Sequence, residues 1–239
     1  MIISHQHKLV ILSPWKTASQ TIRVRLKDID QSPYPKSFHF NPYLNRVVHQ
    51  HLILSDFMCL PEASLGYRIA VFVRNPYDRV FSGFQQVMRD TQMQPRQKFP
   101  AEWIHQLVTQ QIADNFEDLC MAGYDLNHWF AKLPAHKILE CGRNTNLFLH
   151  PCHYWTHRLD QQAADFIGKV ENFEEDFQRL CDTFNLTPVS NQSVNQTHIE
   201  NLPASPNAYR YASLFHKDNV AKINAIFQRD FDLFDYATM

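Results

Sequence analysis

Glycine is scarce in this sequence of 239 residues, which contains only 5 of them. None lies between Met1 and Leu65. This absence excludes a glycine-rich phosphate loop of the G-x-x-x-x-G-K-[ST] type from the first quarter of the chain. It also predicts that turns between the secondary-structure elements rely on proline, asparagine and aspartate instead.

The cysteines and the hydrophobic runs predict neither a disulfide framework nor a membrane span. The five cysteines are odd in number and form no C-x-x-C pair, which predicts reduced, mostly buried thiols rather than a disulfide framework. The longest early apolar run, residues 9–12, is far too short to span a bilayer, and no signal peptide is recognisable. We therefore expect a cytoplasmic protein without a membrane span. The cysteines are Cys59, Cys120, Cys141, Cys152 and Cys181.

Neither sign of charge dominates. The 23 basic and 24 acidic residues give a formal net charge of −1, and the two signs are interleaved along the chain. That balance argues against nucleic acid as a partner, because nucleic-acid binding needs a concentrated basic surface. Apolar residues make up 44% of the chain, enough for a soluble globular core, and we expect a single domain over residues 1–239.

Apolar runs that suit strands alternate with segments of helical periodicity. This alternation predicts an α/β protein: a three-layer, P-loop-like fold with a central, mostly parallel sheet flanked by helices. Irregular loops are expected at 32–42 and 187–208. The predicted strands are 8–12, 46–51, 68–74, 147–150 and 165–170, and the predicted helices are 19–30, 52–60, 75–90, much of 95–133, 174–184 and 213–232.

The segment from Leu9 to Thr21 carries the first chemical signal. A buried strand runs into a turn with one lysine and several hydroxyls, and a helix follows directly. Lys16 brings a full positive charge, and backbone amides at a helix start lack intrahelical acceptors. We therefore expect this turn to hold a phosphate-like group through six residues: Lys16, Thr17, Ala18, Ser19, Gln20 and Thr21.

A second anion site is predicted after the strand at 68–74. Arg74 stands at the end of that strand, and Ser82 lies two turns into the next helix, which starts at Asn75-Pro76. An arginine fork grips phosphate in bidentate fashion, and a serine adds a further donor. Since ligands of parallel sheets bind at the carboxyl ends of the strands, the two sites suit one ligand with two separated phosphate-like groups.

These two segments resemble the PAPS-dependent sulfotransferases, most closely the carbohydrate branch that acts on heparan and chondroitin. Residues 14–21 are similar to that family's P-K-[TA]-[AG]-[ST]-x-[ST] loop, and residues 73–82 to its R-[DN]-P-x-x-R-x-x-S segment. His49-Gln50-His51, followed by Asp56-Phe57, resembles the H-x-H…D-F stretch of uronyl 2-O-sulfotransferases. The C-terminal layout is followed at 166–173, 195–197 and 230–236. Trp15 stands at a variable position, and Asp235 replaces the usual glycine.

The resemblance implies a function and a set of roles. PAPS (3′-phosphoadenosine 5′-phosphosulfate) would be the sulfuryl donor, and an acceptor hydroxyl, expected on a carbohydrate or glycoconjugate, would be the recipient. Lys16 would contact the phosphosulfate, Arg74 and Ser82 would hold the 3′-phosphate, and no metal would be needed. A histidine would take the acceptor proton, and alternation along an extended 47–51 would put His49 and His51 on one face. We favour His51 as this base, with His49 assisting.

Other interpretations stay open at this stage. The turn at Lys16 also fits a P-loop-like nucleotide kinase with a degenerate loop, or a non-catalytic nucleotide-binding relative. Arg79 is expected to pair with Asp78 or Asp90 rather than to touch ligand. Thr197 and Tyr209 are weaker candidates for closing over the nucleotide. The spacing of His150, Cys152, His153 and His157 fits no familiar metal site, and the oligomeric state is left open.

Overall fold

The computed structural model describes residues 1–92, 101–139, 149–190, 192 and 211–239. The chain divides into two compact units, each built from two separate stretches of sequence. The first contains residues 1–74 and 152–198, and the second contains residues 75–151 and 199–239. Each unit is described by itself.

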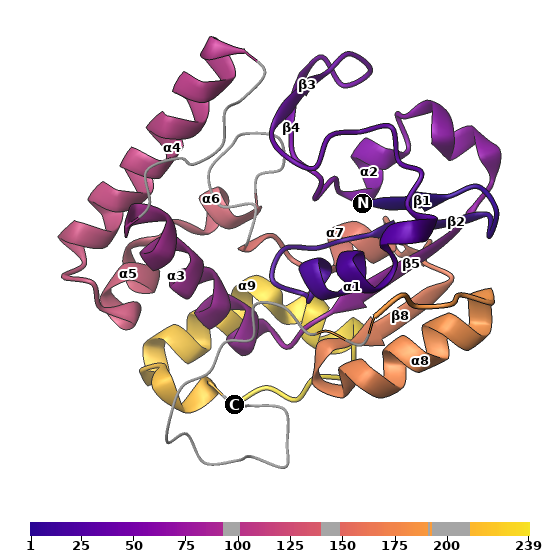
Figure 1. Cartoon of the computed structure of the whole chain (residues 1–239). Coiled ribbons are helices and arrows are strands. Elements are labelled where there is room, and N and C mark those ends of the chain that lie inside the picture. The colour runs from indigo at the N-terminus through magenta and orange to yellow at the C-terminus, as the bar shows by residue number, and fades with distance from the viewer. Residues whose placement is uncertain (93–100, 140–148, 191, 193–210) are drawn as a thin grey trace. The chain divides into compact units, whose positions relative to one another are not determined.

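A four-stranded sheet forms the centre of the first unit, in the order β1-β2-β5-β8 (Figure 1). β2 (Leu9–Leu12), β5 (Arg68–Val73) and β8 (Phe166–Lys169) are parallel, as the sequence predicts. β1 (Ile2–Ser4) pairs antiparallel with β2 through a tight hairpin and was not predicted, because three residues are too few for a period to show. The mixed α/β architecture with a mostly parallel sheet is thus confirmed.

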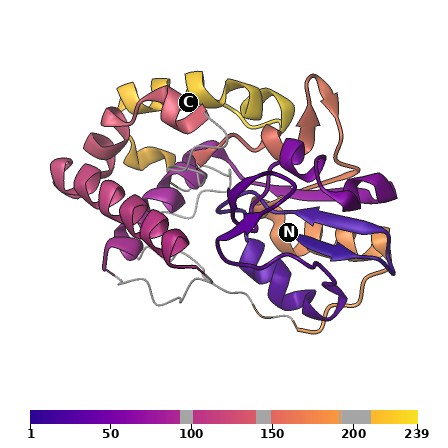
Figure 2. The same cartoon turned by 90° about the horizontal axis from the view of Figure 1, so that it is seen from above.

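Helices cover this sheet on both sides. α1 (Ser19–Arg25) and α8 (Phe173–Phe184) lie against one side (Figure 1), and the short α2 (Leu54–Phe57) and α7 (His153–Thr156) lie on the other (Figure 2). β2 is buried along its whole length, as expected for a strand covered on both faces.

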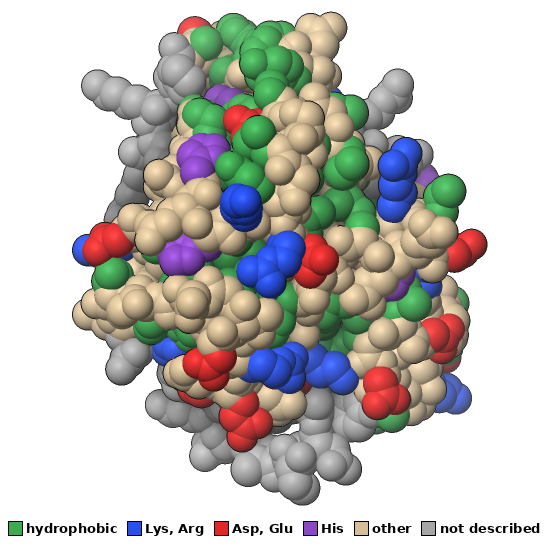
Figure 3. Space-filling view, turned by 90° about the vertical axis from the view of Figure 1, so that its right-hand side faces the viewer, with side chains coloured by type: hydrophobic (Ala, Val, Ile, Leu, Met, Phe, Trp, Pro, Cys, Tyr) green, Lys and Arg blue, Asp and Glu red, His purple; other side chains and the backbone are tan. Residues whose placement is uncertain are grey.

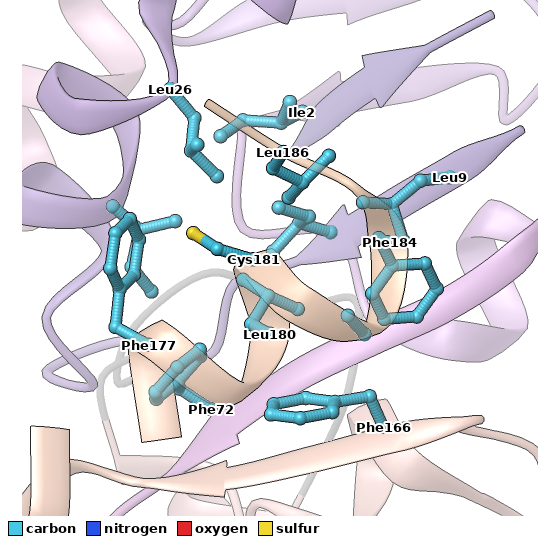
Figure 4. Packing of buried hydrophobic residues seen from close by; sticks show 13 residues of the cluster. Ile2, Leu9, Leu26, Phe72, Phe166, Phe177, Leu180, Cys181, Phe184 and Leu186 are labelled. Carbon is cyan, nitrogen blue, oxygen red and sulfur yellow. The ribbon is translucent and has the colours of Figure 1, made fainter. Parts of the chain in front are cut away.

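The core between the sheet, α1 and α8 is rich in aromatic rings (Figure 4). The ring of Phe72 from β5 lies 6.1 Å from that of Phe166 and 5.4 Å from that of Phe173. Gly168 pairs with Phe72 in the strand register, and a Cβ at this glycine would lie 2.6 Å from the Phe72 ring. A side chain is therefore excluded at position 168 by the packing of its neighbour.

Several boundaries differ from the predictions. The α-helix that starts at Ser19 ends at Arg25 rather than near residue 30, because the Arg25 carbonyl accepts a hydrogen bond from the Val189 amide at 2.8 Å. A 3-10 turn, η1 (Lys27–Ile29), follows it. The remaining 3-10 elements of this unit are η2 (Pro61–Leu65) and η4 (Val170–Asn172).

Two hairpins complete the first unit. β3 (His39–Asn41) pairs with β4 (Arg46–Val48), so the prediction of an irregular loop over 32–42 is wrong at its end. The predicted strand over 46–51 stops at Val48, which leaves both candidate histidines beyond it. β6 (His157–Arg158) and β7 (Gln161–Gln162) form the second hairpin, which the sequence did not reveal.

The second unit is helical in its described part. Its first helix begins as predicted, because Asn75 Oδ1 caps the amide of Tyr77 at 2.9 Å. Leu149 and His150 are not in a strand, contrary to the prediction for 147–150, and residues 147 and 148 lie outside the described part. The helices are α3 (Pro76–Gln92), α4 (Glu102–Met121), α5 (Leu126–Lys132), α6 (Ala135–Leu139), the 3-10 turn η5 (Ala212–Leu214) and α9 (Lys217–Leu233).

Arg79 fastens α3 to α9 inside this unit. Its buried guanidinium lies 3.9 Å from the Asp230 carboxylate, donates to the Leu149 carbonyl at 3.3 Å and stacks over Phe227. The prediction of an ion pair is confirmed in kind, and the structure gives Asp230 as a carboxylate beside this arginine. Of the two predicted partners, Asp78 accepts a hydrogen bond from the Tyr211 amide and Asp90 accepts one from the side chain of Gln86.

The cysteines that the structure describes are free thiols. Cys152 and Cys181 are buried as predicted, whereas Cys59 and Cys120 are exposed, which corrects the expectation of mostly buried thiols. Cys120 lies on α4, and Cys59 lies in the turn after α2. Cys141 lies outside the described residues.

Candidate functional site

The turn between β2 and α1 has a strained backbone. Lys16 and Ala18 adopt left-handed conformations, with φ of +65° and +59°. This conformation costs an L-residue roughly 1–2 kcal/mol and is usually given to glycine. Strained backbone of this kind concentrates at functional sites, where successive amides are turned toward one point. The chain thus builds a sharp turn without the glycines that a phosphate loop normally uses.

Thr17 stabilises this turn from inside. Its hydroxyl donates to the Pro14 carbonyl at 2.8 Å, and the side chain is buried. The proton of Thr17 is therefore directed to the protein backbone, and the predicted role of this hydroxyl as a ligand donor stays a prediction. Thr21, in the first turn of α1, is also buried, whereas Lys16, Ser19 and Gln20 are partly exposed.

Arg74 lies beside the turn, directly after β5. Its Nη1 donates to the carbonyl oxygen of Lys16 at 3.3 Å. Because β2 and β5 are parallel neighbours, their carboxyl ends meet, and this contact joins the two predicted anion-binding segments. A guanidinium has five N–H donors in total, so one bond to a carbonyl does not exhaust its capacity for a phosphate.

His51 is tied to the same turn from its other side. Its Nδ1 lies 2.6 Å from the carbonyl oxygen of Ser13. A carbonyl only accepts hydrogen bonds, so Nδ1 carries the proton and Nε2 keeps its lone pair. Burial of the ring, together with the nearby His49, holds the pKa of His51 well below its usual value. At neutral pH this ring is a neutral imidazole whose Nε2 can accept a proton.

His49 stacks on His51 although neither residue is in a strand. The two ring centroids lie 4.9 Å apart with planes inclined by 12°, and Phe38 packs on His49 at 4.8 Å. Burial lowers the pKa of His49 to about 3, helped by the nearby His39 and Arg23. Its Nδ1 is buried and has no hydrogen-bond partner among the residues that the structure describes. Ring stacking, not strand alternation, brings the two histidines together.

Trp15 contacts both histidines, and sequence reasoning missed it. The indole lies 4.0 Å from the His51 ring and 4.9 Å from the His49 ring, measured between centroids. Trp15 immediately precedes Lys16, so one residue pair places an aromatic face on the histidines and a lysine in the donor turn. A large aromatic residue in an otherwise polar turn was the available signal.

Arg23 makes a further connection that was not predicted. Its guanidinium donates to the Gln50 side chain at 2.5 Å and also to Gln20. Gln50 stands between the two histidines, and Gln20 is one of the predicted donor-binding residues. Burial lowers the pKa of Arg23, but an arginine with this shift stays charged at neutral pH. α1 and the histidine segment are therefore clamped together.

Asp56 belongs to the segment after the histidines and has a structural partner. Its carboxylate accepts from Arg46 of β4 at 2.6 Å, and the adjacent Phe57 is buried. The pair spans the segment from β4 to α2 and holds its two ends together. The D-F dipeptide thus serves to fix the loop that carries the histidines.

The remaining candidates belong to the second unit or lie outside the described residues. Ser82 is buried in α3 of the second unit, so its share in the site stays a prediction. Thr197 and Tyr209 lie outside the described residues. His150 donates through Nδ1 to the Ile138 carbonyl, and the described ranges contain no group of His, Cys, Asp or Glu placed to hold a metal.

Comparison with known proteins decides the family. A model of the sulfotransferase family matches residues 1–237, which is almost the whole chain. The chain belongs to the sulfotransferase family. No curated protein and no solved structure gave a match. Membership makes this sulfotransferase a transferase enzyme that uses a sulfuryl donor and an acceptor.

The surface of the sulfotransferase carries mixed charge on the side that Figure 3 shows. Basic and acidic side chains alternate there with hydrophobic ones, and no large field of one sign is visible on that face. This agrees with the interleaved charges of the sequence. Within the described parts of the chain, no helix is both long and apolar enough to cross a membrane.

Proposed function

We propose that this sulfotransferase transfers the sulfuryl group of PAPS to a hydroxyl group, with a carbohydrate or glycoconjugate as acceptor and His51 as the base. The observation that carries the proposal is the bond between His51 Nδ1 and the Ser13 carbonyl. It leaves Nε2 as a proton acceptor and fixes that base to the turn that bears Lys16. One hydrogen bond thus links the base to the turn that carries the donor-binding lysine.

The chemistry follows from these groups. The acceptor oxygen forms a bond to sulfur while the bond between sulfur and the bridging phosphate oxygen breaks, and the acceptor proton passes to His51 Nε2. 3′-Phosphoadenosine 5′-phosphate leaves with the negative charge. As in phosphoryl transfer, the enzyme mainly aligns the reactants and stabilises charge on the leaving oxygen. Lys16 is the cation assigned to that oxygen, and no metal is required.

The donor is held by the segments that the structure joins. The strained turn from Lys16 to Ala18, with Ser19, Gln20 and Thr21, is assigned to the 5′-phosphosulfate, and it would do the work of a P-loop without glycine. Arg74 is assigned to the 3′-phosphate, with Ser82 as a second donor. The bond from Arg74 to the Lys16 carbonyl supports a common ligand for both segments.

Binding specificity provides the first test. Thermal unfolding is measured with 3′,5′-ADP, with ATP and without nucleotide. A ligand that binds the folded state raises the free energy of unfolding by RT ln(1 + [L]/Kd), and the unfolding midpoint rises with it. The proposal predicts stabilisation by 3′,5′-ADP and none by ATP at equal concentration. Stabilisation by ATP alone would revive the kinase interpretation, for which the family match gives no support.

Turnover on an acceptor panel provides the second test. Labelled PAPS is offered with sugars, glycolipids and simple alcohols, and the label is followed into the acceptor. The proposal predicts transfer to a hydroxyl-bearing sugar and none to amines. Label that moves only to amines, or only to non-carbohydrate alcohols, would refute the acceptor assignment while leaving the donor assignment intact.

A further inference from the structure

Trp15 stands where the donor turn meets the histidine pair. Its ring lies 4.0 Å from His51 and 4.9 Å from His49, closer to His51 than any other ring in the described contacts of that histidine. The planes of Trp15 and His51 are inclined by 31°, so the imidazole lies over the indole face rather than at its edge. The side chain is partly buried.

This arrangement has two physical consequences. A ring packed against the indole face cannot rotate freely about its own side-chain bonds, so Nε2 of His51 keeps its direction. The face of an indole also carries the negative end of a quadrupole, which attracts a cation within about 6 Å of the ring centre. Any positive charge that arises on His51 would arise inside that range.

We propose that Trp15 is a positioning residue for the acceptor base: it holds the His51 ring over the donor turn and stabilises the imidazolium formed when the proton arrives. The inference rests on the proposed function, in which His51 accepts that proton. It extends that function because Trp15 and Lys16 are adjacent in the chain, so Trp15 links the position of the base to that of Lys16. A shift of Lys16 on donor binding would move the support of His51 with it.

Other groups around His51 make this stabilisation necessary. Burial of the ring disfavours a positive charge on it, and so do His49 from the same segment, the amino group of Met1 directly before β1, and Arg23 from α1. The bond to Ser13 acts in the opposite direction, because a carbonyl acceptor favours the protonated ring. Trp15 adds an aromatic face on the side of the ring that the carbonyl does not reach.

Three variants separate the ring's effect from its bulk. Trp15→Leu keeps apolar volume but removes the aromatic face, Trp15→Phe keeps a face, and Trp103→Leu replaces an exposed tryptophan on α4 as the matched control. We expect Trp15→Leu to lower kcat about tenfold, with the affinity for 3′,5′-ADP unchanged. Trp15→Phe is expected to stay within about threefold of the wild type, and Trp103→Leu to leave kcat unchanged.

Nuclear magnetic resonance of His51 gives a readout that does not depend on turnover. In the wild type and in Trp15→Phe, we expect ring-current-shifted His51 signals and a single Nδ1–H tautomer. In Trp15→Leu, the ring-current shift should decrease, because His49 alone remains stacked on His51, and the Nε2–H tautomer should appear. The acidic limb of the pH profile of kcat should also move to lower pH in Trp15→Leu, because the imidazolium has lost a stabilising neighbour.

Two results would overturn the inference. One is a Trp15→Leu enzyme whose kcat, pH profile and His51 signals equal those of the wild type. The other is equal loss of 3′,5′-ADP affinity in Trp15→Leu and Trp15→Phe, which would make Trp15 a donor contact instead. If Trp15→Leu does not fold, Trp15→Met takes its place. Absence of transfer in the wild type would refute the proposed function, while the tautomer measurement still decides the role of Trp15.

Discussion

His51 donates a hydrogen bond from Nδ1 to the carbonyl oxygen of Ser13 at 2.6 Å. Ser13 is the first residue after β2 and lies three residues before Lys16. One bond therefore determines which nitrogen of the ring is free and where that nitrogen is held relative to the donor turn.

Replacement of His51 by asparagine tests the base. The Asn side chain can still donate to the Ser13 carbonyl, but it has no group that accepts a proton at neutral pH. We expect kcat for sulfuryl transfer to fall by about 10²- to 10⁴-fold, with little change in the affinity for 3′,5′-ADP. His128→Asn, at an exposed position of α5, is the matched control and should leave both quantities unchanged.

Replacement of Lys16 by alanine tests charge stabilisation on the leaving oxygen. We expect kcat to fall by about 10²- to 10³-fold, equivalent to ~3–4 kcal/mol, as when one donor to a developing charge is lost. Lys27→Ala, which removes an exposed lysine just after α1, should transfer sulfate at the wild-type rate. Equal kinetics for Lys16→Ala and the wild type would remove Lys16 from the mechanism.

The histidine pair predicts a dependence of stability on pH. The pKa of His49 is lowered to about 3 and that of His51 well below its usual value, so the unfolded chain binds more protons than the native one below pH 6.5. The free energy of unfolding should be highest above pH 7 and should fall by about 1 kcal/mol per histidine between pH 7 and 5.5. The free energy of unfolding is measured with denaturant at pH 7 and at pH 5.5. In His49→Gln/His51→Gln, its decrease between these pH values should be smaller by this amount, whereas the exposed variant His128→Gln should show the wild-type decrease.

Glycine should stabilise the protein at two positions where the backbone is left-handed. Ala18 and Asp235 have φ of +59° and +52°, and Ala18→Gly and Asp235→Gly should each stabilise the protein by about 0.5–1 kcal/mol. Only Ala18→Gly should alter donor affinity, since its turn binds the donor. Ala225→Gly, on an exposed site of α9, should instead destabilise by about 1 kcal/mol. Destabilisation by Ala18→Gly would show that the turn is not strained.

Replacement of Gly168 by alanine should destabilise the protein. A Cβ at this position would lie 2.6 Å from the Phe72 ring, so Gly168→Ala must displace a packed aromatic side chain. We expect a loss of about 1–3 kcal/mol in the free energy of unfolding. A Gly168→Ala/Phe72→Leu double variant should recover part of that loss, because leucine lacks the ring carbons that clash. Simple addition of the two single losses would contradict this explanation.

Long apolar runs made the main part of the fold predictable. β2, β5 and β8 and the helices α3, α8 and α9 were found near their true positions, because each has a continuous run or a period that spans several turns. Short elements were missed for the same reason: β1, β6 and β7 contain only two or three residues, too few for a period to show, although each pairs with a strand close to it in the sequence. The assignment to one domain and to the cytoplasm stays a prediction.

The candidate site was predictable as residues but not as contacts. Lys16, Arg74, His49 and His51 were recognised from residue type and motif spacing. Their connections through Ser13 and the Lys16 carbonyl use backbone oxygens, which every residue has, so no sequence pattern reveals them.

The two missed residues illustrate the same limit. Trp15 acts through the face of its ring, and Arg23 through amide side chains in two segments. Arg23 was a helix residue like many others in the sequence, and only the fold brings Gln50 within its reach. The role of Ser82 in donor binding stays a prediction.

Single-turnover transfer from PAPS, with donor saturating and acceptor provided, tests the central claim most directly. The wild type and His51→Asn are compared after a separate measurement has verified that both bind 3′,5′-ADP with equal affinity. The account predicts rapid appearance of a sulfated hydroxyl product with the wild type and a loss of at least 10²-fold with His51→Asn. Equal rates for the two enzymes, or a wild type that binds PAPS and transfers nothing to any hydroxyl, would contradict it.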